Sequence, residues 1–164
     1  VYGISDFGLA QNLGISRKQA GEYIRAYLDK YSKIRDFMQK TVEEARKNGY
    51  ARTLFGRRRD IPELKSSNFN TRSFGERAAM NAPIQGTAAD IIKLAMVAMD
   101  RALKEGGFAA KLILQIHDEL IVDCPKEEVP EVERLLKKVM EGVATLSVPL
   151  VADVRSGRSW YDTK

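Results

Sequence analysis

The first 48 residues carry apolar side chains at intervals of three and four, the spacing of amphipathic helices. Ser5 is predicted to cap a short helix, and Ser16 to open a longer one that bends near Ser32. Asn48 and Gly49 form a typical helix stop and end the last helix of this region. The tyrosines of the longer helix are expected to pack in the core.

A short stretch of strand-like sequence follows. Residues 50–55 and 58–61 flank Gly56, which predicts a small β-hairpin. Pro62 ends this hairpin, because proline cannot continue a hydrogen-bonded strand. Residues 63–70 are polar and rich in serine and asparagine, so a loop is expected there.

Helical spacing then returns. A helix is expected to run to about Asn81 and to break or kink at Pro83, which has no backbone N–H. The sequence from Thr87 to Asp90 resembles a capping box, so a second helix is predicted from there. Glycines at 106 and 107 end it.

The last third of the chain has three predicted elements. Residues 111–123 contain two apolar runs around a polar centre and predict a central hairpin. Residues 127–144 form an amphipathic helix, and residues 148–154 a final strand. Because helices precede a hairpin, a helix and a strand, the predicted class is α+β with a small antiparallel sheet.

Composition adds three limits. The formal net charge of +5 is consistent with a polyanionic partner, although solubility explains it equally well. The single cysteine, Cys124, excludes an intrachain disulfide and fits a reducing compartment. No apolar stretch has membrane-spanning length, so we expect no membrane association. The chain begins at Val1 without an initiator methionine, and we expect it to be a fragment.

The turn of the central hairpin carries the first candidate chemistry. His117, Asp118 and Glu119 stand between strands that we expect to be buried, where ionisable groups need a partner such as a metal ion. Neighbouring strand residues face opposite ways, so Asp118 and Glu119 are not expected to hold one ion together. One carboxylate suits Mg²⁺, but a two-metal site needs another. Nothing in the sequence brings Asp123 or Asp153 to the turn, and a turn that simply faces water remains an alternative.

Two further groups carry polar side chains of the kind that contact nucleic acid. The basic run of Arg57, Arg58 and Arg59 can hold phosphates, which supply most nucleic-acid affinity. The polar series consists of Arg77, Asn81 and Gln85. Arg77 and Asn81 share a helical face, and all three side chains can donate hydrogen bonds to minor-groove acceptors, which occur on every base pair. A solvated surface is the alternative for both groups.

Four segments stand in a distinctive order: Tyr-Gly at 2–3, Thr-Leu-Phe-Gly-Arg-Arg-Arg at 53–59, Glu-Arg-Ala-Ala-Met-Asn-Ala-Pro-Ile-Gln-Gly-Thr-Ala-Ala-Asp-Ile-Ile-Lys at 76–93, and Leu-Gln-Ile-His-Asp-Glu-Leu at 114–120. In this order they resemble family A DNA polymerases, the bacterial DNA polymerase I type. The resemblance covers essentially the whole chain. It implies template-directed addition of dNTPs to a primer 3′ end, with two Mg²⁺ ions in a complete active site.

The same resemblance implies roles for parts of the chain. Residues 1–48 would be a helical portion of the fingers, and residues 49–164 a portion of the palm. Tyr2 and Gly3 would lie beside the templating base and the incoming nucleotide. The basic run would hold the template–primer backbone, and the polar series would contact the minor groove. Asp118 would bind catalytic metal, with His117 and Glu119 near the primer terminus.

Departures from the family pattern are equally informative. The second metal-binding aspartate of the family, the thumb and most of the fingers helix have no match here. We therefore expect the isolated chain to be inactive without the missing N-terminal part of the polymerase domain, and to self-associate through its uncovered surface. A non-catalytic, sequence-independent DNA-binding module is the alternative function. A hydrolase built on His117 is a weaker one, since no nucleophile has comparable context. The expected location is the bacterial cytoplasm, in association with the nucleoid.

Overall fold

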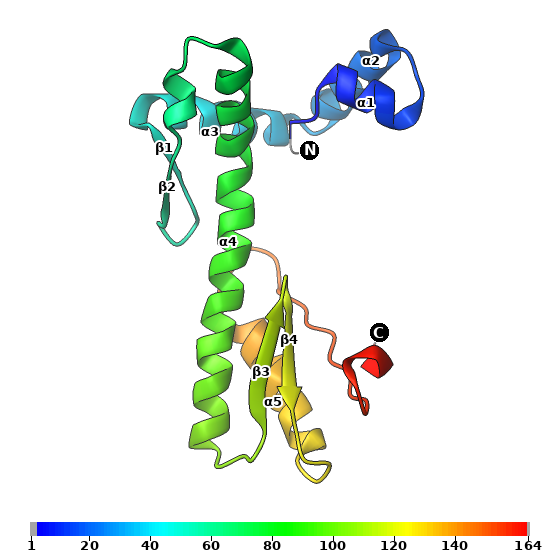
Figure 1. Ribbon diagram of the computed structural model, residues 1–164, viewed down its shortest axis with the longest axis vertical. Coiled ribbons are helices and arrows are strands. Elements are labelled where there is room, and N and C mark those ends of the chain that lie inside the picture. The colour runs from blue at the N-terminus through cyan, green and yellow to red at the C-terminus, as the bar shows by residue number, and fades with distance from the viewer. Residues whose placement is uncertain (1–2, 164) are drawn as a thin grey trace. The chain divides into compact units, whose positions relative to one another are not determined.

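The computed structural model describes residues 3–163, and its chain divides into two compact units, Val1–Thr87 and Ala88–Lys164. Helices dominate both units, and each unit contains one antiparallel hairpin (Figure 1). The predicted α+β class is confirmed. The unit boundary lies inside one long helix, α4 (Phe69–Glu105), which contributes to both units.

The first unit contains α1 (Asp6–Leu13), α2 (Arg17–Lys30), α3 (Ser32–Asn48), β1 (Tyr50–Arg52), β2 (Arg58–Asp60), the 3₁₀ helix η1 (Pro62–Lys65) and the N-terminal part of α4. The hairpin β1–β2 has its strands in register, with Ala51 opposite Arg59. The core of this unit is built mainly from alanines, which allow α3, β1 and α4 to approach closely: Ala45, Ala51, Ile61, Leu64, Ala78, Ala79 and Ala82.

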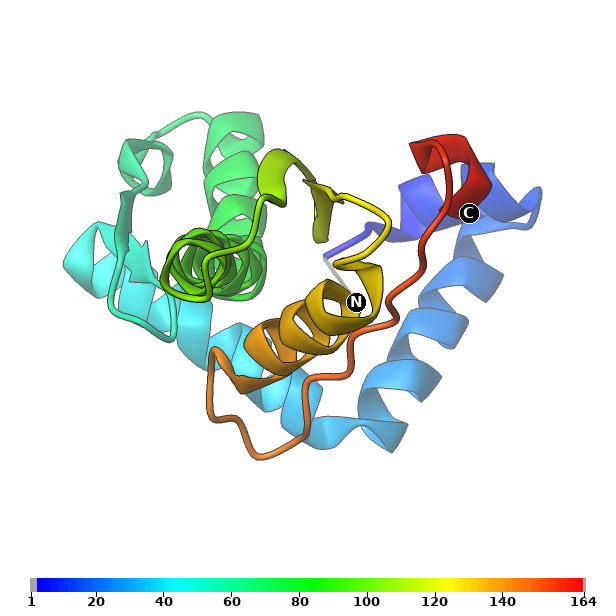
Figure 2. The ribbon, with the colours of Figure 1, turned by 90° about the horizontal axis from the view of Figure 1, so that it is seen from below.

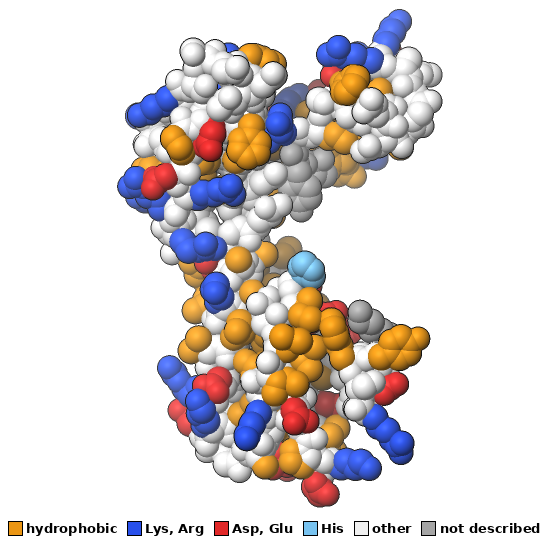
Figure 3. Space-filling view, in the orientation of Figure 1, with side chains coloured by type: hydrophobic (Ala, Val, Ile, Leu, Met, Phe, Trp, Pro, Cys, Tyr) orange, Lys and Arg blue, Asp and Glu red, His pale blue; other side chains and the backbone are white. Residues whose placement is uncertain are grey.

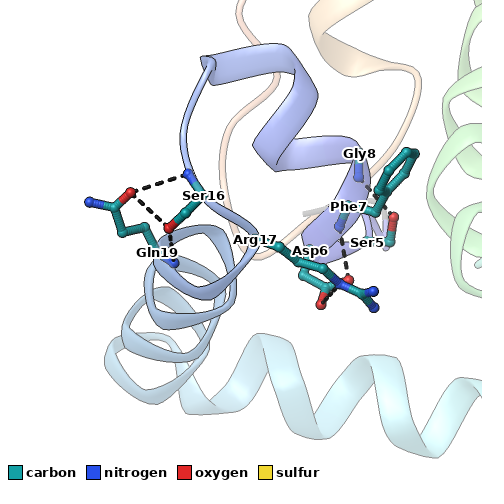
Figure 4. A network of polar contacts seen from close by, with 7 residues as sticks. All are labelled: Ser5, Asp6, Phe7, Gly8, Ser16, Arg17 and Gln19. Atoms are coloured by element: carbon teal, nitrogen blue, oxygen red, sulfur yellow. Dashed lines mark hydrogen bonds and ion pairs between the residues drawn. The ribbon is translucent and has the colours of Figure 1, made fainter.

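Local capping explains where the first helices begin. The side chain of Ser5 accepts a hydrogen bond from the Gly8 N–H, and Ser16 forms a complete capping box with Gln19 (Figure 4). The Arg17 guanidinium lies 2.7 Å from the Asp6 carboxylate and lowers the pKa of that carboxyl. The predicted helix starts at these serines are confirmed.

The tyrosines of α2 do not pack as expected. Tyr23 is 56% exposed and Tyr31, at the end of the helix, is 45% exposed. Only Ala20 of this helix is fully buried, whereas Ile24, Tyr27 and Leu28 are half-buried. The core assignment was wrong for Tyr23 and Tyr31, because helical spacing alone does not say which face is covered.

Helix α4 is continuous across Pro83 for 37 residues, so of the predicted break or kink the break is wrong. The predicted loop over 63–70 is also wrong for most of its length, because η1 occupies its start and α4 begins at Phe69. Thr87 does not cap a new helix, since its hydroxyl donates a hydrogen bond to the Pro83 carbonyl. Tertiary contacts on either side of Pro83 thus override its local preference.

The second unit contains the rest of α4 with β3 (Lys111–Ile116), β4 (Glu119–Asp123), α5 (Val129–Gly142) and the 3₁₀ helix η2 (Trp160–Thr163). Figure 2 shows α5 beside the end of α4, which is seen nearly end-on there. Buried apolar residues of α4, β4 and α5, together with one alanine just before β3, form its core: Ile92, Ala95, Met99, Leu103, Ala110, Leu120, Val132 and Leu136. The predicted central hairpin and the helix that packs on it are confirmed.

Two details of the second unit differ from expectation. The hairpin strands are not both buried, since Ile113 is 60% exposed at a β-bulge and Leu114 is 45% exposed. The final strand predicted over 148–154 does not form. The Ala152 N–H donates to the Glu141 side chain 3.1 Å away, and the described residues provide no strand for this segment to pair with.

Candidate functional site

The β3–β4 turn holds its residues in an unusual conformation. Ile116 pairs with Glu119, which leaves His117 and Asp118 as a two-residue turn. His117 has a φ of 51°, the only positive φ of a non-glycine residue in the part of the chain that the structure describes. The Gln115 side-chain amide donates a 2.6 Å hydrogen bond to the His117 carbonyl and supports the turn. The side chains of His117, Asp118 and Glu119 are exposed, as a site that receives a substrate requires.

Asp118 and Glu119 line one groove of the second unit, with a volume of about 630 Å³. The expectation that they diverge assumed that both lie on a strand, whereas Asp118 lies in the turn. The groove floor is apolar, formed by α4, β4 and α5, and the segment after α5 forms another wall. Asp153 lines this wall, so the structure brings it into the same groove as Asp118, which the sequence could not predict.

The carboxylates that line the groove do not by themselves make a metal site. Carboxylate oxygens suit a hard cation such as Mg²⁺. However, the residues of 3–163 contain no group of three histidine, cysteine or acidic side chains placed to hold an ion. Asp153 is engaged by Arg155 at 3.0 Å, and Asp123 pairs with Lys111 at the far end of the hairpin. A metal site that used Asp118 would therefore need further ligands from elsewhere.

The basic run lies at the β1–β2 hairpin, where lysine and arginine side chains gather on the surface (Figure 3). Its three arginines are not equivalent. Arg57 donates a 2.9 Å hydrogen bond to the Gly86 carbonyl, and Arg58 pairs with Asp60 at 2.6 Å while its guanidinium lies 4.3 Å from the Tyr50 ring centre. Arg59 is exposed, and the described residues offer it no ion pair. Arg59 is thus the member most available to a phosphate.

The polar series lies on α4. Because the helix continues through Pro83, its spacing of four places Arg77, Asn81 and Gln85 along one face. Arg77 and Gln85 are exposed, and the buried Oδ1 of Asn81 has no hydrogen-bond partner among the described residues. The predicted break at Pro83 would have separated Gln85 from the other two.

Gly3 lies directly against this region of α4. It has a φ of 78°, and a Cβ at this position would stand 2.7 Å from the Met80 side chain and 3.4 Å from that of Arg77. The backbone conformation favours glycine, whereas the close approach is to the flexible end of the Met80 side chain. The other residue expected near the nucleotide, Tyr2, falls outside the described residues.

Comparison with known proteins decides the family. The model of DNA polymerase family A matches residues 1–162. The chain belongs to DNA polymerase family A. It is 57% identical over 164 residues to DNA polymerase I of Bacillus subtilis and 52% identical to that of Streptococcus pneumoniae, and it covers 19% of the length of each.

A solved family A structure extends the likeness to three dimensions. The polymerase domain of Pol1 from M. smegmatis, in complex with DNA primer-template and dNTP, matches 99% of this chain with a TM-score of 0.95 and 46% identity. The matched part is 29% of that chain. This family A segment contains no helix long and apolar enough to cross a membrane among the residues that the structure describes.

Sequence reasoning missed several residues that shape the site. Thr53, Gly86 and Thr87 join the β1–β2 hairpin to α4, and Gln115 supports the acidic turn. A signal was present, since all four lie inside the segments that resemble the family. Their contacts could not be found from spacing, because each joins positions brought together by the fold or by a tight turn.

Proposed function

We propose that this chain is part of a DNA-directed DNA polymerase that adds dNTPs to a primer 3′ end according to a template. One observation carries the proposal: in a chain of this family, a tight turn presents Asp118 at the wall of an open groove. Since the chain spans 19% of its curated relatives, the activity belongs to the longer polymerase of which it would be a segment.

In this proposal Asp118 holds catalytic metal, and Mg²⁺ is the expected ion because carboxylate and water oxygens suit it. Two bound ions would stabilise the attacking and leaving oxygens as the primer 3′-hydroxyl displaces pyrophosphate from the dNTP. His117 and Glu119 flank Asp118 and would contact the primer terminus. The second metal-binding carboxylate would come from outside this segment, so the isolated chain would be inactive.

Template–primer DNA would be contacted by two groups of the first unit. The basic run would hold backbone phosphates, chiefly through Arg59, and the polar series would contact minor-groove acceptors. Residues 1–48 would act as a fingers portion and residues 49–164 as a palm portion, with Tyr2 and Gly3 near the incoming nucleotide. The polymerase would work in the bacterial cytoplasm in association with the nucleoid. The bacterial relatives and the DNA- and dNTP-bound structure support this assignment.

Primer extension tests the proposal. The isolated chain, the longer polymerase and the Asp118→Asn form of each are given a recessed 3′ end, Mg²⁺ and four dNTPs. We expect primer extension only from the longer polymerase, and we expect its Asp118→Asn variant to lose this activity. Asp118-dependent extension by the isolated chain would mean that Asp153 or another internal carboxylate completes the site. Full activity of the variant polymerase would contradict the proposed role of Asp118.

A non-catalytic DNA-binding module is the second candidate. It is favoured by one observation, the lack of a three-ligand metal group among the described residues of this chain. Such a module would bind DNA with an affinity that is indifferent to Mg²⁺ and to Asp118→Asn. Primer extension by the longer polymerase that requires Mg²⁺ and is lost in the Asp118→Asn variant would exclude it.

A further inference from the structure

Helix α4 has a weak point at Pro83. Without an N–H, Pro83 cannot donate to the carbonyl of Ala79, so one helical hydrogen bond is lost. The Thr87 hydroxyl donates to the Pro83 carbonyl one turn away, a contact that often bends a helix. The turn from Pro83 to Thr87 therefore needs support from outside the helix to keep one geometry. Gln85 stands in this turn.

The loop of the β1–β2 hairpin supplies that support. The Leu54 N–H donates a 2.9 Å hydrogen bond to the Thr87 hydroxyl oxygen, so this hydroxyl accepts from the hairpin while it donates to the helix. The Arg57 guanidinium donates to the neighbouring Gly86 carbonyl at 2.9 Å. Two successive helix residues, on the C-terminal side of Gln85, are thus tied to the loop.

The loop has hydrogen bonds of its own. The Arg57 N–H donates to the Thr53 hydroxyl at 3.0 Å, and the Thr53 N–H donates to the Arg57 carbonyl at 2.9 Å. Gly56 closes the loop with a φ of 85°. Because these hydrogen bonds fix the backbone of the loop, the loop can hold the helix residues that it contacts in one position.

Gly86 lets the loop reach the helix. A Cβ on Gly86 would stand 2.6 Å from the Thr53 methyl carbon, far inside contact distance, and 3.9 Å from the Thr53 Cβ. Only the methyl group of Thr53 therefore conflicts with a side chain at this position. The Thr53 side chain packs directly against the helix backbone at Gly86.

We propose that Thr53, Gly86 and Thr87 are positioning residues for Gln85. They hold the Pro83–Thr87 turn so that the Gln85 amide meets a minor-groove acceptor of the primer–template, and none of the three contacts DNA itself. This inference rests on the proposed function, because Gln85 acts only when the longer polymerase holds a duplex.

The first test measures the clamp in this chain without any activity. Thr87→Val keeps the shape but removes the hydroxyl, whereas Thr87→Ser keeps the hydroxyl. Amide hydrogen exchange at Leu54 should be at least about tenfold faster in the valine variant and unchanged in the serine variant. Equal exchange in all three proteins would overturn the clamp, whatever the fate of the proposed function.

The second test uses steric rescue in the longer polymerase. Gly86→Ala should displace the Pro83–Thr87 turn and lower kcat/KM for primer extension by roughly tenfold to a hundredfold, the effect expected when a substrate-positioning residue moves slightly. Helix propensity alone predicts no such loss, because alanine is a better helix former than glycine. Adding Thr53→Ser removes the conflicting methyl group and should restore most of the loss. Normal activity of the single variant, or no rescue in the double variant, would contradict the close fit.

The third test connects the clamp to Gln85. A primer ending in 3-deazaguanine lacks the minor-groove N3 acceptor. If the clamp acts through Gln85, Thr87→Val should change kcat/KM much less on this primer and in a Gln85→Ala background. In both cases the ratio of kcat/KM without and with Thr87→Val should approach one. If Thr87→Val lowers kcat/KM by the same factor with and without the Gln85 contact, the two effects are independent. That result would show a merely structural role for Thr87 and overturn the proposal. A wild-type polymerase without activity would instead defeat the proposed function, and the exchange test would still decide the clamp.

Discussion

The two hairpins have the same topology but are held in place differently. Ala51 of β1 packs in the alanine-rich core of the first unit, the loop of the β1–β2 hairpin is joined to α4 through polar contacts of Leu54 and Arg57, and strand β2 is exposed throughout. The hairpin β3–β4 is held by apolar packing, with Leu120 buried against α4 and α5. One surface is therefore rich in arginine, whereas hydrophobic side chains cover much of the other (Figure 3).

This difference in how the hairpins are held suits the role proposed for each. Exposed polar contacts contribute little stability each, but they are directional and fix a position. Apolar burial supplies free energy without direction, so the β3–β4 strands can be anchored while their turn remains free to present Asp118. We expect substitutions in β3–β4 to act mainly on folding and chemistry, and substitutions in β1–β2 mainly on DNA affinity.

The largest effect on stability is expected from Leu120→Ala. Its side chain is buried in the core of the second unit, so its loss should lower the free energy of unfolding by about 2–5 kcal/mol. Ile113→Ala removes a similar side chain from an exposed position of the same hairpin and is the matched control. Urea unfolding measures both. Equal midpoints for the two variants would mean that apolar burial does not anchor β3–β4.

A smaller effect concerns self-association, which stays a prediction. The exposed Ile113 and Leu114 of β3 offer apolar surface, whereas the exposed side chains of β2 are charged. Ile113→Glu should weaken association of the isolated chain by about tenfold or more, as loss of one buried aliphatic contact implies. Sedimentation over a range of concentrations measures this. Leu54→Glu on the other hairpin is the control, and an equal effect there would remove the contrast between the hairpins.

The smallest effect is expected from Arg59→Gln. If Arg59 contacts one phosphate, the slope of log K for primer–template binding against log salt should become less steep by about 0.9. Lys138→Gln on α5 removes the same charge far along the chain and should leave the slope nearly unchanged. An unchanged slope for Arg59→Gln would assign DNA affinity to other residues.

Local signals predicted the first two helix starts and both hairpins correctly. Ser5 and Ser16 cap their helices with side chains only three residues from their partners, so the sequence contains the whole interaction. The same holds for the turn at His117 and Asp118, where two apolar runs specify the register. Family resemblance supplied the candidate roles, since spacing alone left each as one of two alternatives.

The errors arose where a distant partner decides the structure. Pro83 stays inside α4 because Thr87 and the β1–β2 loop support that turn, which no local pattern shows. Residues 148–154 have strand-like composition, but a strand needs a neighbour with which to pair. Asp153 reaches the groove of Asp118 through the path of the chain after α5. Such placements depend on tertiary contacts and could not be predicted from the sequence.

The division of labour between the hairpins is tested most directly by steady-state primer extension with the longer polymerase. In the Asp118→Asn variant kcat should fall, while the affinity for DNA stays nearly unchanged. The fall should exceed the roughly 10–100-fold loss that follows mutation of a residue that only supports a metal ligand. The Arg59→Gln variant should show a raised KM for primer–template and an unchanged kcat. The reverse pattern, or the same pattern in both variants, would contradict the account.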